Sequence, residues 1–229
     1  MKKRIFTFIG IIISVITNAQ IEVHKIDLTS SGALFRNPDF NKLELKKIEG
    51  SPYLNKDFVL AEISGVPQKI LVRYNILNDL IEVQFDNKQN YNLTKEEPYS
   101  TISPINQSNK IKLLRYINKE GEIFGYLTEI YVSDKLVVYR KDQVKLQKAK
   151  EAISTYHEAS PAKFIKLNPE FYWNLHNNKI TLIPKNKKSL IELFPNKKEN
   201  ITNFIKENKI DFDDEKGIIE LSKFVQTIK

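Results

Sequence analysis

The chain has 229 residues, of which 41% are hydrophobic and 28% are charged. This composition is typical of a globular protein with an ordinary apolar core, and it excludes an intrinsically disordered chain. The chain contains no Cys. A disulfide framework, thiol catalysis and thiolate metal sites are therefore excluded as well.

The N-terminus has the pattern of a secretory signal peptide. Lys2, Lys3 and Arg4 precede an apolar run over residues 5–16, and Thr17-Asn18-Ala19 offers small or tolerated side chains to a signal peptidase. The apolar run is short for a membrane span, so an uncleaved anchor is the weaker alternative. Without Cys the chain cannot become a lipoprotein. We expect cleavage after residue 19, no integral membrane segment afterwards, and export, to the periplasm rather than the cell surface.

The chain carries more basic than acidic side chains. Its formal charge of +8 falls to +5 once the first 19 residues are removed, because 33 basic and 28 acidic residues remain. An exported chain rarely meets nucleic acid, so we expect no nucleic-acid partner. An envelope protein, an anionic lipid or a polysaccharide is the better candidate. The alternative is that the spread lysines only keep the protein soluble.

The first half of the chain predicts short antiparallel strands. Apolar residues alternate with polar ones over residues 69–85, with Asn78-Asp79 at the turn, which predicts a hairpin with one buried face. Residues 22–28 and 57–63 fit two further strands. Residues 111–117, 123–132 and 136–146 then form three strands with short turns between them. The turns between these strands are too short for a crossover helix. The three strands therefore predict a meander and argue against a parallel α/β sheet.

Residues 147–161 look like a connector with at most a weak helix. Residues 163–167, Phe171-Tyr172-Trp173 and residues 180–183 follow, and they predict one more hairpin. The three aromatic residues could form a stacking platform for sugars. Alternation instead favours Phe171 and Trp173 in the core, with Tyr172 facing the other way.

The last forty residues change to a helical period. Ser189 with Glu192 fits a capping box, and Asn196 with Glu199 repeats the pattern after Pro195 has ended the first helix. For the last helix, the expected cap is Asp213 or Asp211. Two apolar stripes give the second and the last helix one buried side each: Ile201, Phe204 and Ile205, then Ile218, Leu221, Val225 and Ile228.

These elements predict an α+β protein. A meander-rich antiparallel sheet, which could curl into a half barrel, precedes a small cluster of short helices. We expect residues 1–19 to be the signal peptide, residues 20–184 the mainly β domain, and residues 185–229 the helical region.

Few residues have the spacing of a chemical site. His24, His157 and His176 stand far apart, and no phosphate-binding glycine loop or nucleophile elbow is visible. The alternating acids Asp211, Asp213 and Glu215 resemble a calcium loop but lack its glycine and its final glutamate, so helix capping is the better explanation. We predict no catalytic, metal-binding or cofactor-binding residue.

One basic set could gather into a patch for anionic headgroups or an acidic protein, although solvated helix faces explain the same residues. Its members are Lys185, Lys187, Lys188, Lys197, Lys198, Lys206 and Lys209.

Several short motifs together resemble a family of uncharacterised exported proteins of the Bacteroidetes. These motifs are Gly50-Ser51-Pro52-Tyr53-Leu54, Phe58, Arg73-Tyr74-Asn75, Asn78-Asp79, Glu82 and Pro161-Ala162-Lys163-Phe164. The signal ending Asn18-Ala19-Gln20 is similar to that family as well, and the resemblance covers most of the chain after the signal. It implies export in a Gram-negative cell, and it implies no activity and no functional residue.

Three functions remain open at this point. The first is a non-enzymatic protein-interaction module of the cell envelope. The second is a carrier that encloses a small apolar or lipid-like ligand in a curled sheet. The third is a hydrolase of cell-wall polysaccharide that works with two carboxylates, which sequence spacing alone does not reveal.

Overall fold

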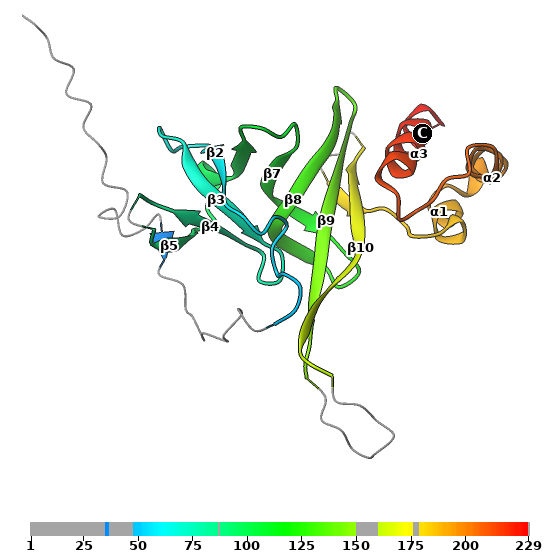
Figure 1. Ribbon diagram of the computed structural model, residues 1–229. Helices are drawn as coiled ribbons and strands as arrows, with labels where there is room; N and C mark the ends of the chain where they lie inside the picture. The colour runs from blue at the N-terminus through cyan, green and yellow to red at the C-terminus, as the bar shows by residue number, and fades with distance from the viewer. Residues whose placement is uncertain (1–34, 37–47, 87, 150–159, 176–178, 229) are drawn as a thin grey trace, which may run out of the picture.

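The structure is a computed structural model, and it describes residues 35–36, 48–86, 88–149, 160–175 and 179–228. In this part of the chain, eleven strands form one sheet, followed by three α-helices. The fold is α+β, as the sequence predicts, with a partial ring at the centre of the sheet, an open region on one side and the helices on the other (Figure 1).

The open region, which we call the wing, contains the first six strands. They are β1 (Phe35–Arg36), β2 (Val59–Ile63), β3 (Ile70–Asn75), β4 (Leu80–Gln84), β5 (Asn90–Leu93) and β6 (Thr101–Pro104). Their spatial order is β1-β5-β4-β3-β2-β6, and every neighbouring pair is antiparallel. A short 3-10 helix, η2 (Glu97–Tyr99), leads into β6.

The partial ring, which we call the ring, contains the remaining strands. They are β7 (Lys110–Ile117), β8 (Glu122–Ser133), β9 (Leu136–Gln147), β10 (Lys163–Asn174) and β11 (Ile180–Leu182). The sheet continues from β6 through β7, β11, β10 and β9 to β8, and β8 also pairs with β7. A single parallel residue pair, Thr181 with Ile117, joins β11 to β7.

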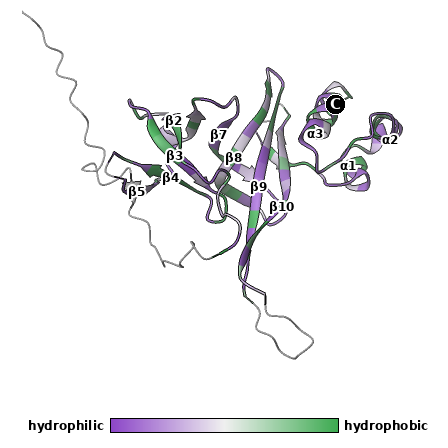
Figure 2. Cartoon of the chain, in the orientation of Figure 1, coloured by the Kyte–Doolittle hydropathy of each residue, from purple (hydrophilic) through white to green (hydrophobic). Residues whose placement is uncertain are grey.

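Most predicted strands are confirmed. The hairpin over residues 69–85 is β3 and β4, with Leu71 opposite Gln84 and Asn75 opposite Leu80. The predicted meander is β7, β8 and β9, and Figure 2 shows both hydrophobic and hydrophilic residues along β8 and β9. Residues 163–174 form one long strand with an irregular register between Leu167 and Glu170, where the sequence indicates two segments. The predicted strand over residues 22–28 and most of the connector lie outside the described residues.

Three apolar clusters form the core. The first lies between the inner face of the wing and β7 and β8, and includes Val72, Ile81 and Leu113. The second lies between the ring and the helices. The third contains one buried residue from each ring strand: Tyr116, Leu127, Tyr139, Tyr172 and Ile180. The interior of the ring is therefore filled by side chains, as in other small barrels.

The C-terminal helices cover the ring through their apolar sides (Figure 1). They are α1 (Lys187–Leu193), α2 (Lys198–Glu207) and α3 (Glu215–Ile228), with the 3-10 turn η3 (Pro195–Lys197) between the first two. Ile201, Leu221 and Val225 are fully buried in the cluster that also contains Trp173. Each such buried side chain contributes about 1.5–3 kcal/mol.

The predicted helix caps are wrong by a few residues. Asn186 caps α1, because its side-chain oxygen accepts from the backbone N–H of Ser189 at 2.9 Å, and Ser189 lies within the helix. Lys197 precedes α2 and provides no side-chain cap. Asp214 caps α3 by accepting from the N–H of Gly217 at 2.9 Å. Several Asn, Asp and Ser residues lie near the starts of the helices, and each of these types suits a cap, so the tertiary path decides among them.

None of the helices in the described ranges is long and apolar enough to cross a membrane.

Candidate interaction surface

A row of apolar side chains crosses the outer face of the wing. Leu71 of β3 lies directly opposite Leu60 of β2, and the N–H of Ile105 donates to the carbonyl of Leu60 at 2.9 Å. The three residues are therefore neighbours across β3, β2 and the end of β6. Leu71 is 37% exposed, Leu60 is 45% exposed and Ile105 is 43% exposed. We call Leu60, Leu71 and Ile105 the apolar row.

The alternation of the strands explains why these side chains point outward. Successive side chains of a strand point to opposite faces of the sheet. Ala61 and Val72, which follow Leu60 and Leu71, are buried in the first core cluster at 0% and 2% exposure. The inner positions of the wing are filled, so the strands leave the apolar row on the surface.

An arginine clamp borders the apolar row on the same face. The Arg73 guanidinium carbon lies 3.6 Å from the centre of the Tyr53 ring and 4.3 Å from that of Phe58. Its Nη2 pairs with Glu82 at 2.6 Å, and its Nη1 donates to the carbonyl of Lys56 at 3.1 Å. A planar guanidinium can stack and form directed hydrogen bonds at the same time, which a lysine cannot. We call Tyr53, Phe58, Arg73 and Glu82 the clamp.

Glu82 is buried, although alternation with Ile81 and Val83 places it on the polar face of the predicted hairpin. Its second oxygen accepts from Asn75 Nδ2 at 3.1 Å, so both oxygens have partners. Burial raises the pKa of Tyr53, and the negative charge of Glu82 raises it further. The clamp therefore holds the hydrogen-bonded Arg73–Glu82 pair against two aromatic rings.

Backbone contacts hold the segment that contains Tyr53 against β3. The carbonyl of Pro52 accepts from the N–H of Ile76 at 2.8 Å, and the N–H of Leu54 donates to the backbone carbonyl of Tyr74 at 3.0 Å. Gly50 has φ +87°, and a Cβ there would lie 2.7 Å from the carbonyl oxygen of Phe164. Only glycine suits this close approach in a left-handed conformation.

Several charged and polar side chains near the row pair with each other. Lys69 pairs with Glu62 at 3.4 Å, and Gln84 Nε2 donates to Asn90 Oδ1 at 2.9 Å. Together with the paired Arg73 and Glu82, these contacts leave little net charge beside the apolar row.

The opposite side of the β3–β4 hairpin carries a polar cluster at its turn. Asp79, at φ +53°, pairs with Lys95 at 2.6 Å and with Lys141, and it accepts from the Tyr74 hydroxyl at 2.7 Å. The N–H of Tyr126 lies 3.3 Å from both of its carboxylate oxygens. We call Asp79, Lys95, Lys141 and Tyr74 the latch, because it joins the wing to β8 and β9 of the ring.

The latch is partly withdrawn from water, and this shifts its ionisation. Burial alone would raise the pKa of Asp79, but the charge of Lys141 and hydrogen bonds from Lys141, Lys95 and Tyr74 outweigh it and lower the pKa. Burial lowers the pKa of Lys141 despite the opposing charge of Asp79. Burial and the nearby Asp79 raise the pKa of Tyr74 well above its ordinary value.

The geometry of the latch is that of a structural tie. A general acid needs a raised pKa, whereas the pKa of Asp79 is lowered and its oxygens are surrounded by donors. Lys141 donates to Asp79, to Tyr74 and to the carbonyl of Tyr126, so its three protons have acceptors. Gly125 makes room for the carboxylate, because a Cβ there would lie 2.6 Å from Asp79 Oδ2.

The sequence-predicted candidates do not assemble into a site. His24, His157 and His176 lie outside the described residues. Phe171, Tyr172 and Trp173 are only 3%, 1% and 3% exposed, so the sugar platform is wrong and the predicted alternation holds. Phe171 and Trp173 face the helices, and Tyr172 fills the ring.

The acidic residues at the start of α3 cap the helix and bind it to the ring strands. Asp214 caps it, Asp213 accepts from Asn168 Nδ2 at 2.6 Å, and Glu215 pairs with Arg140 of β9 at 2.5 Å. Among the residues with described positions, no group of three or more His, Asp or Glu side chains is arranged to hold a metal ion.

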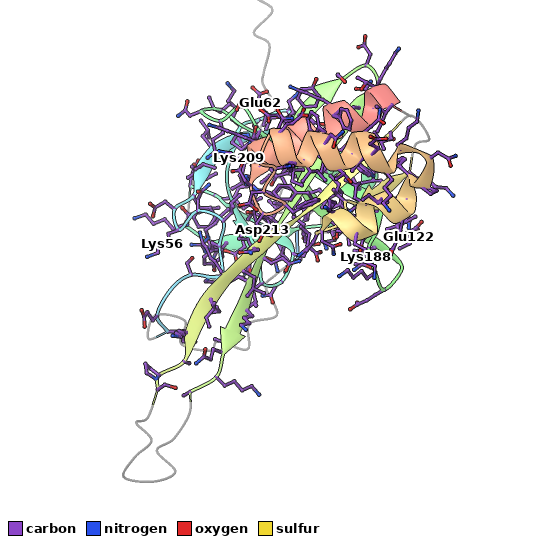
Figure 3. All side chains as sticks on the ribbon, turned by 90° about the vertical axis from the view of Figure 1, so that its right-hand side faces the viewer. Lys56, Glu62, Glu122, Lys188, Lys209 and Asp213 are labelled. Atoms are coloured by element: carbon purple, nitrogen blue, oxygen red, sulfur yellow. The ribbon has the colours of Figure 1, made fainter. Side chains whose placement is uncertain are left out.

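The basic set is spread over the helical layer. All of its lysines are exposed except Lys197, which is half-buried. Lys188 and Lys209 lie on opposite sides of this layer in Figure 3. A helix surface of solvated lysines therefore describes the set better than a single patch.

The structure brings the motif residues of the N-terminal half together. Tyr53, Phe58, Arg73 and Glu82 form the clamp, and Asp79 forms the latch on the other side of the same hairpin. Their partners Lys95 and Lys141, and the apolar row, were not predicted from the sequence. No local signal marks these residues, because they meet only through pairing of distant strands.

Comparisons with protein-family models, with curated proteins and with solved structures found no match for this chain.

Proposed function

We propose that this protein is exported, loses residues 1–19 and acts in the periplasm as a non-enzymatic interaction module for another envelope protein. The apolar row is the single observation that carries the proposal. Leu60, Leu71 and Ile105 are contiguous across three neighbouring strands, and all three are more than a third exposed. Single exposed apolar residues are ordinary, whereas a contiguous apolar group within a polar rim is typical of a protein contact.

The surroundings of the row support a partner with an apolar centre and an uncharged polar rim. Two pairs of charges beside the row are matched within this chain, Lys69 with Glu62 and Arg73 with Glu82. A strongly charged partner would find no complementary field here. The clamp also keeps Tyr53 and Phe58 fixed, so the surface loses little conformational entropy on binding.

The other two functions receive less support. A carrier needs space inside the ring, and five side chains, three of them tyrosines, fill that interior. A two-carboxylate hydrolase needs one acid with a raised pKa beside a second acid. Asp79 is instead held by two lysines, and its pKa is lowered.

Site-specific photo-crosslinking in cells that export the protein tests the proposal. A crosslinking amino acid at position 60 is expected to give an adduct with one envelope protein. The same amino acid at position 132 is the control, because Val132 is 58% exposed near the end of β8, in the ring and not in the row. Leu71→Asp and Ile105→Asp should each remove the adduct, and each should weaken binding of the identified partner to the purified protein by about tenfold or more.

Two results would contradict the proposal. One is an adduct that forms equally at positions 60 and 132, which would show that contact is not directed by the row. The other is an adduct of twice the chain mass as the sole product, which would make a second copy the occupant instead of a different protein.

A further inference from the structure

A pocket of about 370 Å³ lies where the turn between β2 and β3 meets the start of β6. Its volume is within the range of small-ligand sites. It lies within the wing but is separate from the apolar row, since none of Leu60, Leu71 and Ile105 lines it. We call it the turn pocket.

Local contacts hold the turn pocket in shape. The N–H of Ser64 donates to the carbonyl of Thr101 at 2.9 Å, and the N–H of Thr101 donates to Ser64 Oγ at 3.0 Å. Gly65, at φ +73°, packs so closely that a Cβ there would lie 2.7 Å from the carbonyl oxygen of Pro98. The turn is therefore largely pre-formed, which reduces the entropy lost when a ligand binds.

The polar side chains of the pocket suit hydroxyl groups. The hydroxyls of Ser64, Thr101 and Ser103 and the amide of Gln68 line it. Each of these groups both donates and accepts hydrogen bonds, as a sugar hydroxyl does. Pro67, which is exposed and also lines the pocket, supplies apolar surface for the C–H groups of a ring.

The charges of the pocket exclude a strong preference for an ionic ligand. Its carboxylate, Glu62, and its ammonium, Lys69, lie 3.4 Å apart and are both more than half exposed. They neutralise each other. An anion site needs an uncompensated cation or a group of directed N–H donors, and the described lining provides a balanced pair instead.

We infer that the turn pocket binds a neutral saccharide. The observations that carry this inference are the pre-formed turn, the set of hydroxyl and amide groups and the charge-balanced rim. A Ser- or Thr-rich peptide offers similar hydroxyls. Its backbone amides, however, would compete with those hydroxyls for the few polar side chains that line the pocket, and the pocket is open to water. We therefore commit to the saccharide and treat the peptide as an outcome of the test.

The test is a titration of the purified, exported protein followed by two-dimensional amide NMR. The probes are glucose, galactose, xylose and N-acetylglucosamine, with glucuronic acid, glucose 6-phosphate and a Gly-Ser-Thr-Ser peptide for comparison. We expect at least one neutral sugar to shift the amide signals of Ser64, Gln68 and Thr101 in a saturable way, with a Kd on the order of 1 mM. No other protein is present, so this result is independent of the proposed envelope partner.

Two substitutions locate the binding. Gln68→Ala and Thr101→Val should each raise the Kd about fivefold, and Thr227→Val on α3, far from the pocket, should leave it unchanged. Gln68 is exposed, so Gln68→Ala keeps the test valid even if Thr101→Val fails to fold. The inference is overturned if no neutral sugar gives saturable shifts at about 50 mM, if the acidic sugars or the peptide bind more tightly, or if Thr227→Val weakens binding equally.

Discussion

At the scale of single residues, Asp79 fixes the wing to the ring. It occupies a left-handed turn conformation that aspartate tolerates better than most residues. From there its carboxylate meets Lys95 of the wing, Lys141 of the ring and the backbone of Tyr126. A partly buried ion pair is weak evidence for net stability, but removal of one partner leaves the others uncompensated. Loss of the Asp79 carboxylate would therefore leave Lys95 and Lys141 partly buried without their negative partner, and this would lower the stability of the fold.

The first prediction concerns Asp79 and pH. Its folded-state pKa lies below the unfolded value of about 3.9, so its stabilising contribution is complete above that pH and is lost as the pH falls through the folded pKa. Asp79→Asn should lower the free energy of unfolding at pH 7 by about 2 kcal/mol or more. It should also lose less stability between pH 7 and pH 3 than the wild type does.

Urea unfolding at the two pH values measures this difference. Asp86→Asn, at the exposed turn between β4 and β5, is the matched control and should follow the wild type. Equal losses on acidification for the wild type and Asp79→Asn would show that Asp79 does not contribute through its charge.

At the scale of elements, the helices are specified by their apolar stripes more firmly than by their caps. Ile218, Leu221 and Val225 recur at helical spacing, and all three are buried against the ring. The caps depend on where the incoming loop turns. Asp211, Asp213 and Asp214 all precede α3, and each has a different hydrogen-bond partner.

The second prediction compares two of these aspartates. Asp214→Ala should lower the free energy of unfolding by about 1 kcal/mol, because it removes the oxygen that accepts from the Gly217 N–H in the first turn. Asp213→Ala should change it by less than about 0.5 kcal/mol, because its contact with Asn168 is exposed.

Fluorescence of Trp173 during urea unfolding reports both changes. It is the single Trp of the chain, and it is buried against the helices, with its ring centre 6.3 Å from that of Phe194. If Asp213→Ala proved the more damaging of the two, Asp213 would be the functional cap, as the sequence suggests.

At the scale of the whole molecule, the ring lies between two further apolar clusters. Tyr126 and Leu113 face the wing cluster, Phe171 and Trp173 face the helices, and Tyr172 fills the ring itself. The helices therefore complete the core of the β region. Arg140 of β9 reinforces this contact by pairing with Glu215 at the start of α3.

The third prediction is that a chain ending at Pro184 does not fold stably. Without the helices, Leu136, Phe171 and Trp173 would be exposed to water on one face of the ring, and an apolar patch of this kind promotes association. We expect a red-shifted Trp173 emission, binding of a hydrophobic dye and soluble aggregates in size-exclusion chromatography. A chain ending at Ile228 keeps the whole of α3, so it is the control and should stay native. A native-like monomer ending at Pro184 would instead make residues 20–184 an independent domain.

Local patterns predicted the strands of the hairpin and the meander because the alternation that buries one face is visible in the residues themselves. They did not predict that Glu82 is buried, since its partners are Arg73 and Asn75 on the paired strand. The single long strand over residues 163–174 also escaped prediction, because a register shift interrupts its alternation. The apolar row was missed for a related reason, since its residues come from three strands.

The sequence by itself determined the α+β class, the exclusion of disulfides and thiol chemistry, and the places of the hairpin, the meander and the helices along the chain, whereas β5 and β6 were not predicted. These properties depend on composition and on periodicities of two or 3.6 residues, which are local. Only the tertiary structure decided the partial closure of the ring, the latch between Asp79 and Lys141, and the position of the turn pocket. Each of these joins residues far apart in the chain, and such pairings follow from the packing of the whole molecule.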